Sequence, residues 1–160
     1  MLSPKNNIMN TVKDEGETTK IFRKELAIST HKRMEIQDIT NTVTQVVEES
    51  KIVNGLVHLW VPHATAAIAV NEHDTDLWDD ILTVFERLAP MNGNYRHNAK
   101  YSWTASEQNA HAHILNCLIK PSVTVPLENG KMQLGTWQSV LFIEMDGSRT
   151  RQIQVQVIGE

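Results

Sequence analysis

Cysteine, glycine and long apolar runs are all scarce in this chain, and each shortage excludes a class of protein. Cys117 is the single cysteine among 160 residues, so no internal disulfide can form and we expect a reducing, cytoplasmic setting. The 7 glycines never cluster, which excludes a P-loop and a dinucleotide-binding fingerprint, and no Gly-x-Ser-x-Gly motif is present. No stretch approaches the roughly 18 apolar residues of a membrane span, and no apolar run of a secretory signal opens the chain. We therefore expect no membrane partner and no leader segment.

Positive charge is scarce as well. The 15 lysines and arginines are outnumbered by 19 acidic residues, which gives a net charge of -4, and they form no basic stripe. Nucleic acid is therefore not an expected partner, because its phosphates normally meet a basic patch. A hydrophobic content of 41% over this length suits one domain with a real core. Residues 1–19 are polar and lack periodicity, so we expect a mobile tail there and a single domain over residues 20–160.

The apolar pattern predicts a mixture of strands and helices, and therefore an α+β fold. Apolar residues alternate with polar ones where strands are expected and recur every three to four residues where helices are expected. Helices are predicted behind Thr40 or Asn41, behind Asp74 or Thr75, and over 106–118; strands are predicted from Ile21 and over 56–61, 66–70, 122–127, 139–145 and 152–158. The segment 95–103 is expected to be irregular. The sequence also allows 56–61 and 66–70 to pair as a hairpin, which would separate His63 from Glu72.

The predicted helix over 106–118 has two contrasting edges. One edge is polar, because Asn109, His113 and Asn116 follow each other at spacings of four and three. The other edge is apolar and is expected to lie in the core, which would make Cys117 a buried reduced thiol. The positions expected to be buried are Ala110, Ile114, Cys117 and Leu118.

The last predicted strand has one apolar face and one uncharged polar face. Lysine or glutamate would dissolve a solvent face just as well as glutamine, so we interpret the glutamine face as a candidate interface with another subunit. The apolar residues are Ile153, Val155 and Val157, and the interleaved glutamines are Gln152, Gln154 and Gln156.

Histidine is the most informative residue type in the sequence. Five of the seven histidines lie at positions 58, 63, 97, 111 and 113, beside apolar sequence and outside any histidine-rich tract. Imidazole binds metals and transfers protons near neutral pH, so three converging rings would form a site for a small polar ligand. On a helix, positions 111 and 113 diverge by about 200°, so only one of them faces such a site. His58 alternates with Leu56 and Trp60, and a core position explains it better than a site role does.

Several motifs, taken in order, resemble those of the YjbQ family, whose members are often called secondary thiamine-phosphate synthases. They are Gly55-Leu-Val-His-Leu leading into His63-x-Thr-Ala-Ala-Ile-x-Val-Asn-Glu72, then Asn94-Tyr-Arg-His97, then Asn109-Ala-His-Ala-His113-Ile, and then Val125-Pro-Leu-Glu-Asn-Gly-Lys-Met-Gln-Leu-Gly-Thr-Trp-Gln138 followed by Glu144-x-Asp-Gly147 and Arg151. The likeness spans residues 20–160. It implies a β-sandwich core with flanking helices, assembled as a homotrimer whose sheets pack around a threefold axis.

The resemblance also implies a pocket and an activity. It implies a transferase that joins a pyrimidine diphosphate to a thiazole phosphate, with a small phosphorylated metabolite as partner and a divalent metal, zinc or magnesium, as cofactor. Two alternatives remain: a metal-dependent enzyme that acts on another phosphorylated metabolite, and a non-enzymatic trimeric protein that binds metal or ligand. The implied catalytic residues are His63, Glu72, His97 and His113; the metal ligands are His63, His97 and His113; and the substrate-binding residues are Thr65, Asn71, Arg96, Trp137, Gln138 and Arg151.

Overall fold

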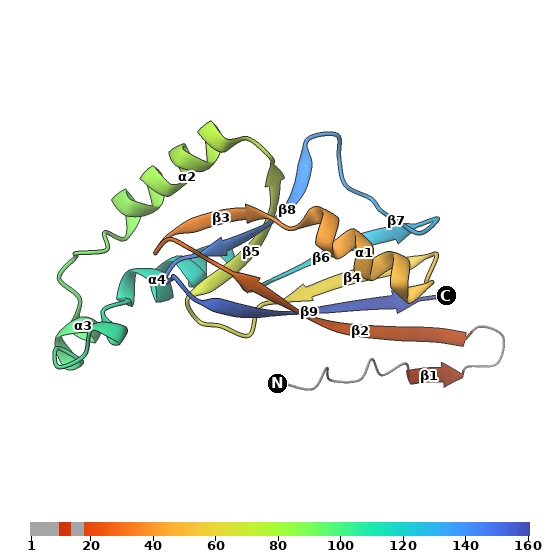
Figure 1. The fold of residues 1–160 in the computed structure, drawn as a ribbon, viewed down its shortest axis with the longest axis horizontal. Coiled ribbons are helices and arrows are strands. Elements are labelled where there is room, and N and C mark those ends of the chain that lie inside the picture. The colour runs from red at the N-terminus through yellow and green to blue at the C-terminus, as the bar shows by residue number, and fades with distance from the viewer. Residues whose placement is uncertain (1–9, 14–17) are drawn as a thin grey trace.

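The computed structural model describes residues 10–13 and 18–160, and in this part of the chain the strands form two antiparallel sheets. The large sheet has the order β1-β2-β9-β4-β6-β7 and the small sheet the order β3-β8-β5 (Figure 1). The strands are β1 (Asn10–Lys13), β2 (Thr18–Ser29), β3 (Glu35–Asp38), β4 (Gly55–Trp60), β5 (Ala66–Glu72), β6 (Ser122–Glu128), β7 (Lys131–Met132), β8 (Gln138–Glu144) and β9 (Thr150–Gly159). The helices are α1 (Thr40–Ser50), α2 (Thr75–Leu88), α3 (Arg96–Lys100) and α4 (Ala110–Ile119), with a 3-10 turn η1 at Ala105–Glu107. The predicted mixture of strands and helices is confirmed.

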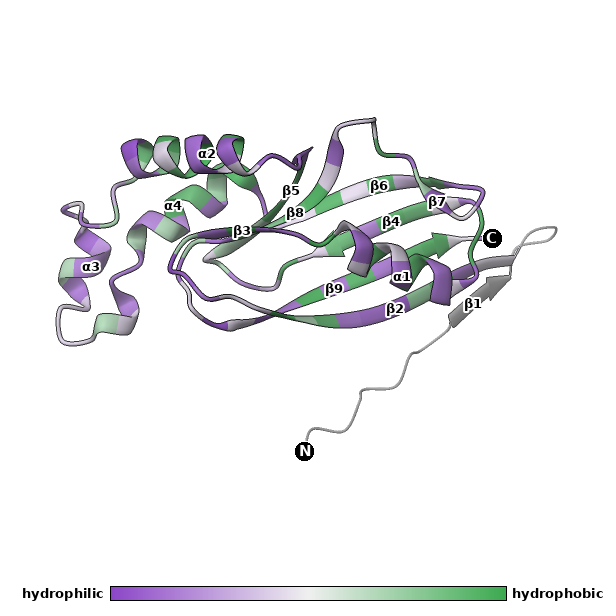
Figure 2. Ribbon diagram, turned by 45° about the horizontal axis from the view of Figure 1, so that its top comes forward, coloured by the Kyte–Doolittle hydropathy of each residue, from purple (hydrophilic) through white to green (hydrophobic). Residues whose placement is uncertain are grey.

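Two apolar clusters lie on opposite faces of the small sheet. One cluster joins the inner faces of both sheets with α1, and it includes Val43, Phe142 and Val155. The other joins the far face of the small sheet with α2 and α4, and it includes Leu115 and Leu141. In Figure 2 apolar residues recur along the central strands β4 and β9, whereas α3 is mostly polar. The small sheet is therefore the buried middle of the domain, and α3 lies at its edge.

Strand β9 follows the predicted alternation. Ile153, Val155 and Val157 are fully buried, and the interleaved glutamines face outward. β9 lies between β2 and β4 in the large sheet, so these glutamines share its outer face with His58 of β4. His58 is thus not a core residue: it lies on this outer face, and its Nδ1 is 2.9 Å from Oγ1 of Thr124.

Helix α4 is rotated relative to the sequence prediction. Its buried residues are Ala110, His111, Ala112 and Leu115, whereas Ile114 and Leu118 are 42% and 62% exposed and Cys117 is an exposed free thiol. The reason lies in the polar edge of the helix, because Asn109 donates to Oδ2 of Asp146 and Asn116 donates to the carbonyl of Ala66. These two bonds fix the rotation of the helix and turn its larger apolar residues outward.

The chain crosses between the two sheets three times at the same end of the domain. The crossings are residues 30–34 from β2 to β3, 61–65 from β4 to β5, and 145–149 from β8 to β9. We call the place where these crossings meet the corner; in Figure 1 it lies beside α4. β4 and β5 therefore belong to different sheets, and the hairpin that the sequence allowed does not form.

The segment 1–19, expected to be a tail, is described only in part. Residues 1–9 and 14–17 lie outside the described residues, whereas Asn10–Lys13 form β1 and pair with the beginning of β2 at Thr18. The mobile tail stays a prediction, because only residues 10–13, 18 and 19 of this segment are described. None of the helices in the described ranges is long and apolar enough to cross a membrane.

Candidate functional site

A buried ion pair joins the two sheets at the corner. Glu144 ends β8 in the small sheet and Arg151 begins β9 in the large sheet, and both side chains are almost completely buried. Nε of Arg151 donates to Oε2 of Glu144 at 2.7 Å, and Nη2 donates to Oε1 at 2.6 Å and to Oγ1 of Thr65 at 3.0 Å. A bidentate guanidinium–carboxylate pair has one favoured geometry. Arg151 is therefore held in a fixed orientation.

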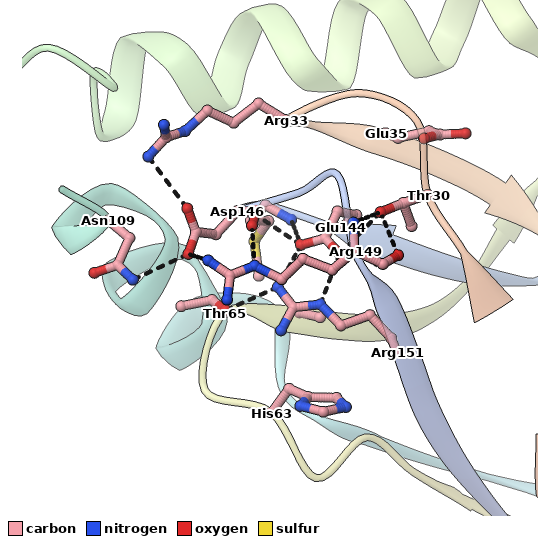
Figure 3. A network of polar contacts seen from close by, with 12 residues as sticks. Thr30, Arg33, Glu35, His63, Thr65, Asn109, Glu144, Asp146, Arg149 and Arg151 are labelled. Atoms are coloured by element: carbon pink, nitrogen blue, oxygen red, sulfur yellow. Dashed lines mark hydrogen bonds and ion pairs between the residues drawn. The ribbon is translucent and has the colours of Figure 1, made fainter. Parts of the chain in front are cut away.

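A second buried carboxylate, that of Asp146, holds two further arginines. Its Oδ1 lies 3.1 Å from Nη2 of Arg33, and its Oδ2 accepts from Nη2 of Arg149 at 2.7 Å and from Asn109 at 3.0 Å. Figure 3 shows Arg33 and Arg149 approaching Asp146 from opposite sides. Unlike Arg151, both arginines are partly exposed, at 41% and 44% of the side chain. Asp146 thus positions two cationic groups that still meet solvent.

Gly147 explains why the crossing 30–34 lies so close to Asp146. A Cβ atom at this position would lie 2.5 Å from the carbonyl oxygen of Lys32, which is backbone and cannot yield. Without a side chain, Gly147 donates its N–H to the carbonyl of Arg33 at 2.9 Å. The glycine therefore permits the approach that brings Arg33 to Asp146.

His63 lies beside Arg151 in the crossing 61–65 (Figure 3). The backbone N–H of Gln152 donates to its Nε2 at 3.1 Å, so this nitrogen carries no proton and the neutral ring is protonated on Nδ1. Burial and the neighbouring charge of Arg151 hold the pKa of His63 below its usual value of 6.5. None of the described residues accepts a hydrogen bond from Nδ1. His63 thus offers a neutral N–H donor next to a fixed guanidinium.

His113 lies in the middle of the polar edge of α4, as the spacing of 109, 113 and 116 predicted. Asn109 binds Asp146 and Asn116 lies 3.4 Å from the carbonyl of His63, so this edge covers the corner. The ring of His97 from α3 lies 5.1 Å from the ring of His113, measured between centroids. Burial, followed by the charge of His97, lowers the pKa of His113 from 6.5. At neutral pH His113 is therefore an uncharged base.

The corner carries an excess of positive charge. Three guanidinium groups, those of Arg33, Arg149 and Arg151, face the two carboxylates of Glu144 and Asp146. The nearby Glu35 does not offset the difference, because it is bound by the amides of His31 and Lys32 and turns away from the arginines in Figure 3. Among these five groups positive charge exceeds negative charge by one, in a chain whose net charge is -4, and the charge of Glu107 acts further away on His113. Such a place attracts an anion.

The structure does not gather all of the expected site residues. His63, Thr65 and Arg151 meet at the corner. His113 lies on the edge of α4 that covers the corner, His97 contacts His113, and Arg96 is exposed on α3. Asn71 and Glu72 lie at the opposite end of β5 from Thr65, where their strand partners are Ser139 and Gln138 and where Trp137 is 73% exposed. Seven residues of extended strand separate the two groups by about 20 Å. Within one chain the expected site residues therefore form two separate groups.

The described residues do not form the three-histidine metal site. In residues 10–13 and 18–160, no group of three or more His, Cys, Asp or Glu side chains is arranged to hold a metal ion. His97 and His113 meet, but Nε2 of His63 already accepts from the backbone of Gln152. A catalytic zinc has three protein ligands as a rule, and magnesium prefers oxygen. A bound zinc or magnesium ion stays a prediction, and proton transfer by the histidines does not require it.

The comparisons with known proteins agree in one assignment. A family model described as UPF0047 protein YjbQ-like matches residues 24–160. The chain belongs to this family. A UPF0047 protein of Methanothermobacter thermautotrophicus is 40% identical over 145 residues, which cover 91% of this chain and 97% of that relative. The UPF0047 protein YugU of Bacillus subtilis is 37% identical over 138 residues, which cover 85% and 98%.

Solved structures of UPF0047 relatives share the fold. The crystal structure of a YbjQ-like protein of unknown function from Sulfolobus solfataricus has a TM-score of 0.83 at 36% identity, covering 89% of this chain and 99% of that one. A hypothetical protein from Aeropyrum pernix has a TM-score of 0.79 at 37% identity, covering 86% and 98%. The coarse fold, with antiparallel sheets and a few helices, is therefore confirmed.

The expected thiamine-phosphate synthase activity is wrong. The UPF0047 relatives carry only the family designation, and the Sulfolobus protein is described as being of unknown function. None of these names links the family to thiamine phosphate or to a transferase. The assignment came from the resemblance alone, and no residue at the corner is specific for a pyrimidine or a thiazole.

Several residues of the corner were absent from the expected site residues. Glu144 follows the apolar run 140–143, and a charged residue within an apolar strand implies a buried charge that needs a partner. Arg151, seven residues later, is that partner. This signal was present in the sequence, whereas Arg33 reaches the corner from a distant part of the chain and had no such signal. The missed residues are Arg33, Asn109, Glu144, Asp146 and Arg149.

Proposed function

We propose that this UPF0047 protein binds a small phosphorylated metabolite at the corner and moves a proton on it with the paired rings of His97 and His113. The observation that carries the proposal is the excess positive charge of the corner, held by guanidinium groups of fixed orientation in an acidic chain. Arginine suits phosphate because its planar fork matches the phosphate oxygens.

Unused hydrogen-bond donors support the phosphate assignment. Among the described residues, none accepts a hydrogen bond from Nη1 of Arg151 or from Nδ1 of His63. Arg149 uses Nε and Nη2 on Asp146, which leaves its own Nη1. A phosphate group has three strong acceptor oxygens, enough for all three donors. The neutral His63 adds a donor without raising the total charge.

His113 has the properties of a general base. Its pKa is lowered by burial and by His97, so the ring is neutral at pH 7 and able to accept a proton. In this proposal it takes that proton from a hydroxyl group or a water molecule beside the bound phosphate. The negative charge of Asp146 then favours the imidazolium that forms. His97 lies against the same ring, with 5.1 Å between the ring centroids.

Binding is tested by calorimetry with glycerol 3-phosphate, and glycerol serves as the uncharged control ligand. Arg149→Gln removes one guanidinium that is 44% exposed, so the protein should fold and bind at least about tenfold more weakly. Arg87→Gln is the matched control, since Arg87 is exposed on α2 and outside the corner. Equal losses in both variants, or equal binding of glycerol, would remove the support for a phosphate site.

Proton transfer is tested separately through His113→Gln. Glutamine keeps the polar edge of α4 but cannot act as a base, so glycerol 3-phosphate should still bind. Turnover of any phosphate ester that the unaltered protein converts should fall about 10²-fold or more. Undiminished turnover in this variant would exclude the base role of His113 and leave the binding proposal standing.

We also propose that the chain assembles as a homotrimer through the outer face of the large sheet, with the two sheets forming a β-sandwich. The sandwich is supported by the apolar cluster that both sheets share. The interface is supported by the uncharged outer residues Gln154 and His58 and by Trp60, which is 41% exposed. Light scattering of Gln154→Lys should show a monomer if this face is the interface, and an unchanged mass contradicts it.

A cytoplasmic location and a bound divalent cation are the remaining parts of this proposal. An exposed free thiol at Cys117 is best kept in a reducing compartment, which supports the location. Only the pair His97 and His113 supports a cation, and a cation bound there would replace the base role of His113, because it occupies the same ring nitrogen. Elemental analysis of the purified protein, compared with the His97→Gln variant, tests it: metal content that is equal in both, or absent in both, contradicts binding at this pair.

A further inference from the structure

A cavity of about 480 Å³ is lined in part by Arg33, which lies on the other side of Asp146 from Arg149 and His63 in Figure 3. It is lined by Arg33, by the loop 91–95, by residues of α3 and the following turn, and by Gln108. Cavities of this size bind small molecules in other proteins. None of the expected site residues lines it, and Arg33 is the one lining residue that it shares with the corner.

Arg33 is the charged residue of this lining, and most of its donors are unused. Its Nη2 donates to the carbonyl of Gln108 at 2.7 Å and lies 3.1 Å from Oδ1 of Asp146. These contacts fix the guanidinium but leave Nε and Nη1, for which no described residue is an acceptor. The lining contains no acidic residue to compete for them. Nε and Nη1 of Arg33 are therefore available to bind an anionic group.

The walls of the cavity are fixed in the absence of a ligand. In the loop 91–95, Gly93 donates to the carbonyl of Pro90 at 3.0 Å, and the hydroxyl of Tyr95 donates to the same carbonyl at 2.9 Å. A Cβ atom at Gly93 would lie 2.7 Å from the ring of Tyr95, so the glycine permits this close packing. The side-chain amide of Gln108 donates to three carbonyls near α3, at Asn98, Tyr101 and Thr104. Such a site is preformed.

We infer that this cavity is a second binding site, and that it takes a small organic carboxylate containing an amide or hydroxyl group. One guanidinium with its charge already shared with Asp146 matches a single negative charge better than a phosphate monoester, which carries about 1.5 to 2 charges. The amides of Asn92, Asn94 and Asn98 suit the polar part of such a ligand, and Met91 and Tyr95 supply apolar contact for its remainder.

The test uses hippurate, an aromatic amide with one carboxylate, and its uncharged carboxamide. In ¹⁵N-resolved NMR spectra, hippurate should shift the backbone amides of 91–102 and Gln108, whereas the carboxamide should bind at least about tenfold more weakly. Arg33→Gln should weaken hippurate binding by a similar factor. Arg87→Gln is the control for loss of an arginine and should bind as the unaltered chain does.

Ser102→Trp keeps the inference testable if Arg33→Gln disturbs the fold. Ser102 is exposed and lines the cavity, so a tryptophan there fills space without removing a hydrogen bond of the described structure. This variant should lose hippurate binding but retain glycerol 3-phosphate binding at the corner. The inference is overturned if hippurate still binds Ser102→Trp, if the carboxamide binds equally well, or if hippurate shifts only residues of the corner.

Discussion

Glu144 and Asp146 are two buried carboxylates that lie two residues apart, yet they hold arginines of opposite character. Glu144 binds a buried guanidinium through two parallel hydrogen bonds, and Thr65 accepts a third. Asp146 binds two guanidiniums that are each more than two-fifths exposed. The first arrangement orients Arg151 and leaves only its Nη1 for a ligand, whereas the second leaves two partly exposed guanidinium groups facing solvent.

The difference teaches which charges support the fold and which are available to a ligand. A buried ion pair contributes little net stability compared with apolar residues of the same volume, but removing one partner is costly because the other charge stays buried. An exposed ion pair contributes little net stability, and removing one of its partners costs little. The loss of unfolding free energy on substitution should therefore be largest at Glu144, smaller at Asp146 and smallest at Arg149. The loss of ligand affinity should not follow this order.

The largest expected effect is that of Glu144→Gln. Glutamine fits the same space, but it removes the negative charge beside Arg151, whose side chain is only 5% exposed. The free energy of unfolding should fall by about 3–5 kcal/mol, as for other broken buried pairs. Urea denaturation followed by circular dichroism measures it.

The control is the double variant Glu144→Gln, Arg151→Met, which removes the unpaired charge as well. It should recover most of the stability lost in Glu144→Gln. A loss below about 1 kcal/mol in the single variant, or no recovery in the double one, would show that burial of the Arg151 charge is not what makes Glu144 necessary.

Asp146→Asn should have an intermediate effect. Asparagine keeps one oxygen for Arg33, but its amide group would face the N–H donors of Asn109 and Arg149. Water can reach the freed arginines, so the expected loss is about 1–3 kcal/mol, below that of Glu144→Gln. Thermal and urea unfolding of both variants under the same conditions decide the order. A larger loss for Asp146→Asn would reverse the comparison.

Much of the fold was predictable from local patterns. The alternation in 152–158 predicted the buried face of β9, and Asp74 was foreseen as a cap of α2, where its side chain accepts from the N–H groups of Asp76 and Leu77. Both predictions depend on residues that are neighbours in sequence, and local periodicity reports on such neighbours. The polar edge of α4 with His113 was predictable for the same reason.

The corner was not predictable, because it depends on three chain crossings from distant parts of the sequence. No local signal shows that β4 and β5 belong to different sheets, so the relation between His63 and Glu72 could not be decided. The buried face of α4 was predicted wrongly because its rotation is fixed by Asn109 and Asn116, which bind Asp146 and Ala66. Tertiary hydrogen bonds thus outweighed the apolar spacing of Ile114 and Leu118.

Lowering the pH should reduce the free energy of unfolding, by less than Glu144→Gln or Asp146→Asn does. The pKa values of His63, His111 and His113 are all lowered in the folded protein, chiefly by burial, from the usual 6.5. As the pH falls below about 6.5, the unfolded chain takes up protons that the folded chain does not, so the free energy of unfolding decreases. The expected loss between pH 7 and pH 5.5 is on the order of 1 kcal/mol, and His111, which is fully buried, contributes most of it.

Urea denaturation at a series of pH values measures this effect. His111→Gln is the informative variant, because glutamine can still donate to the carbonyl of Met145 that accepts from Nε2 of His111. Its stability should depend less on pH over this interval. Stability that rises as the pH falls from 7 to 5.5 would contradict the lowered pKa values, since the sign of the dependence is fixed by them.

Arg149→Gln should change stability least of all, by at most about 1 kcal/mol, because its guanidinium is 44% exposed and water can replace its contacts with Asp146. Arg33 and Asn109 continue to bind Asp146, so the carboxylate does not lose all its partners. The same variant is expected to lose phosphate binding, which separates it from Glu144→Gln. Urea denaturation and calorimetry on one preparation measure both quantities. If Arg149→Gln were as unstable as Glu144→Gln, the partly exposed arginines would also be required for the fold. The proposed difference between Glu144, whose ion pair stabilises the fold, and Asp146, whose arginines bind a ligand, would then be wrong.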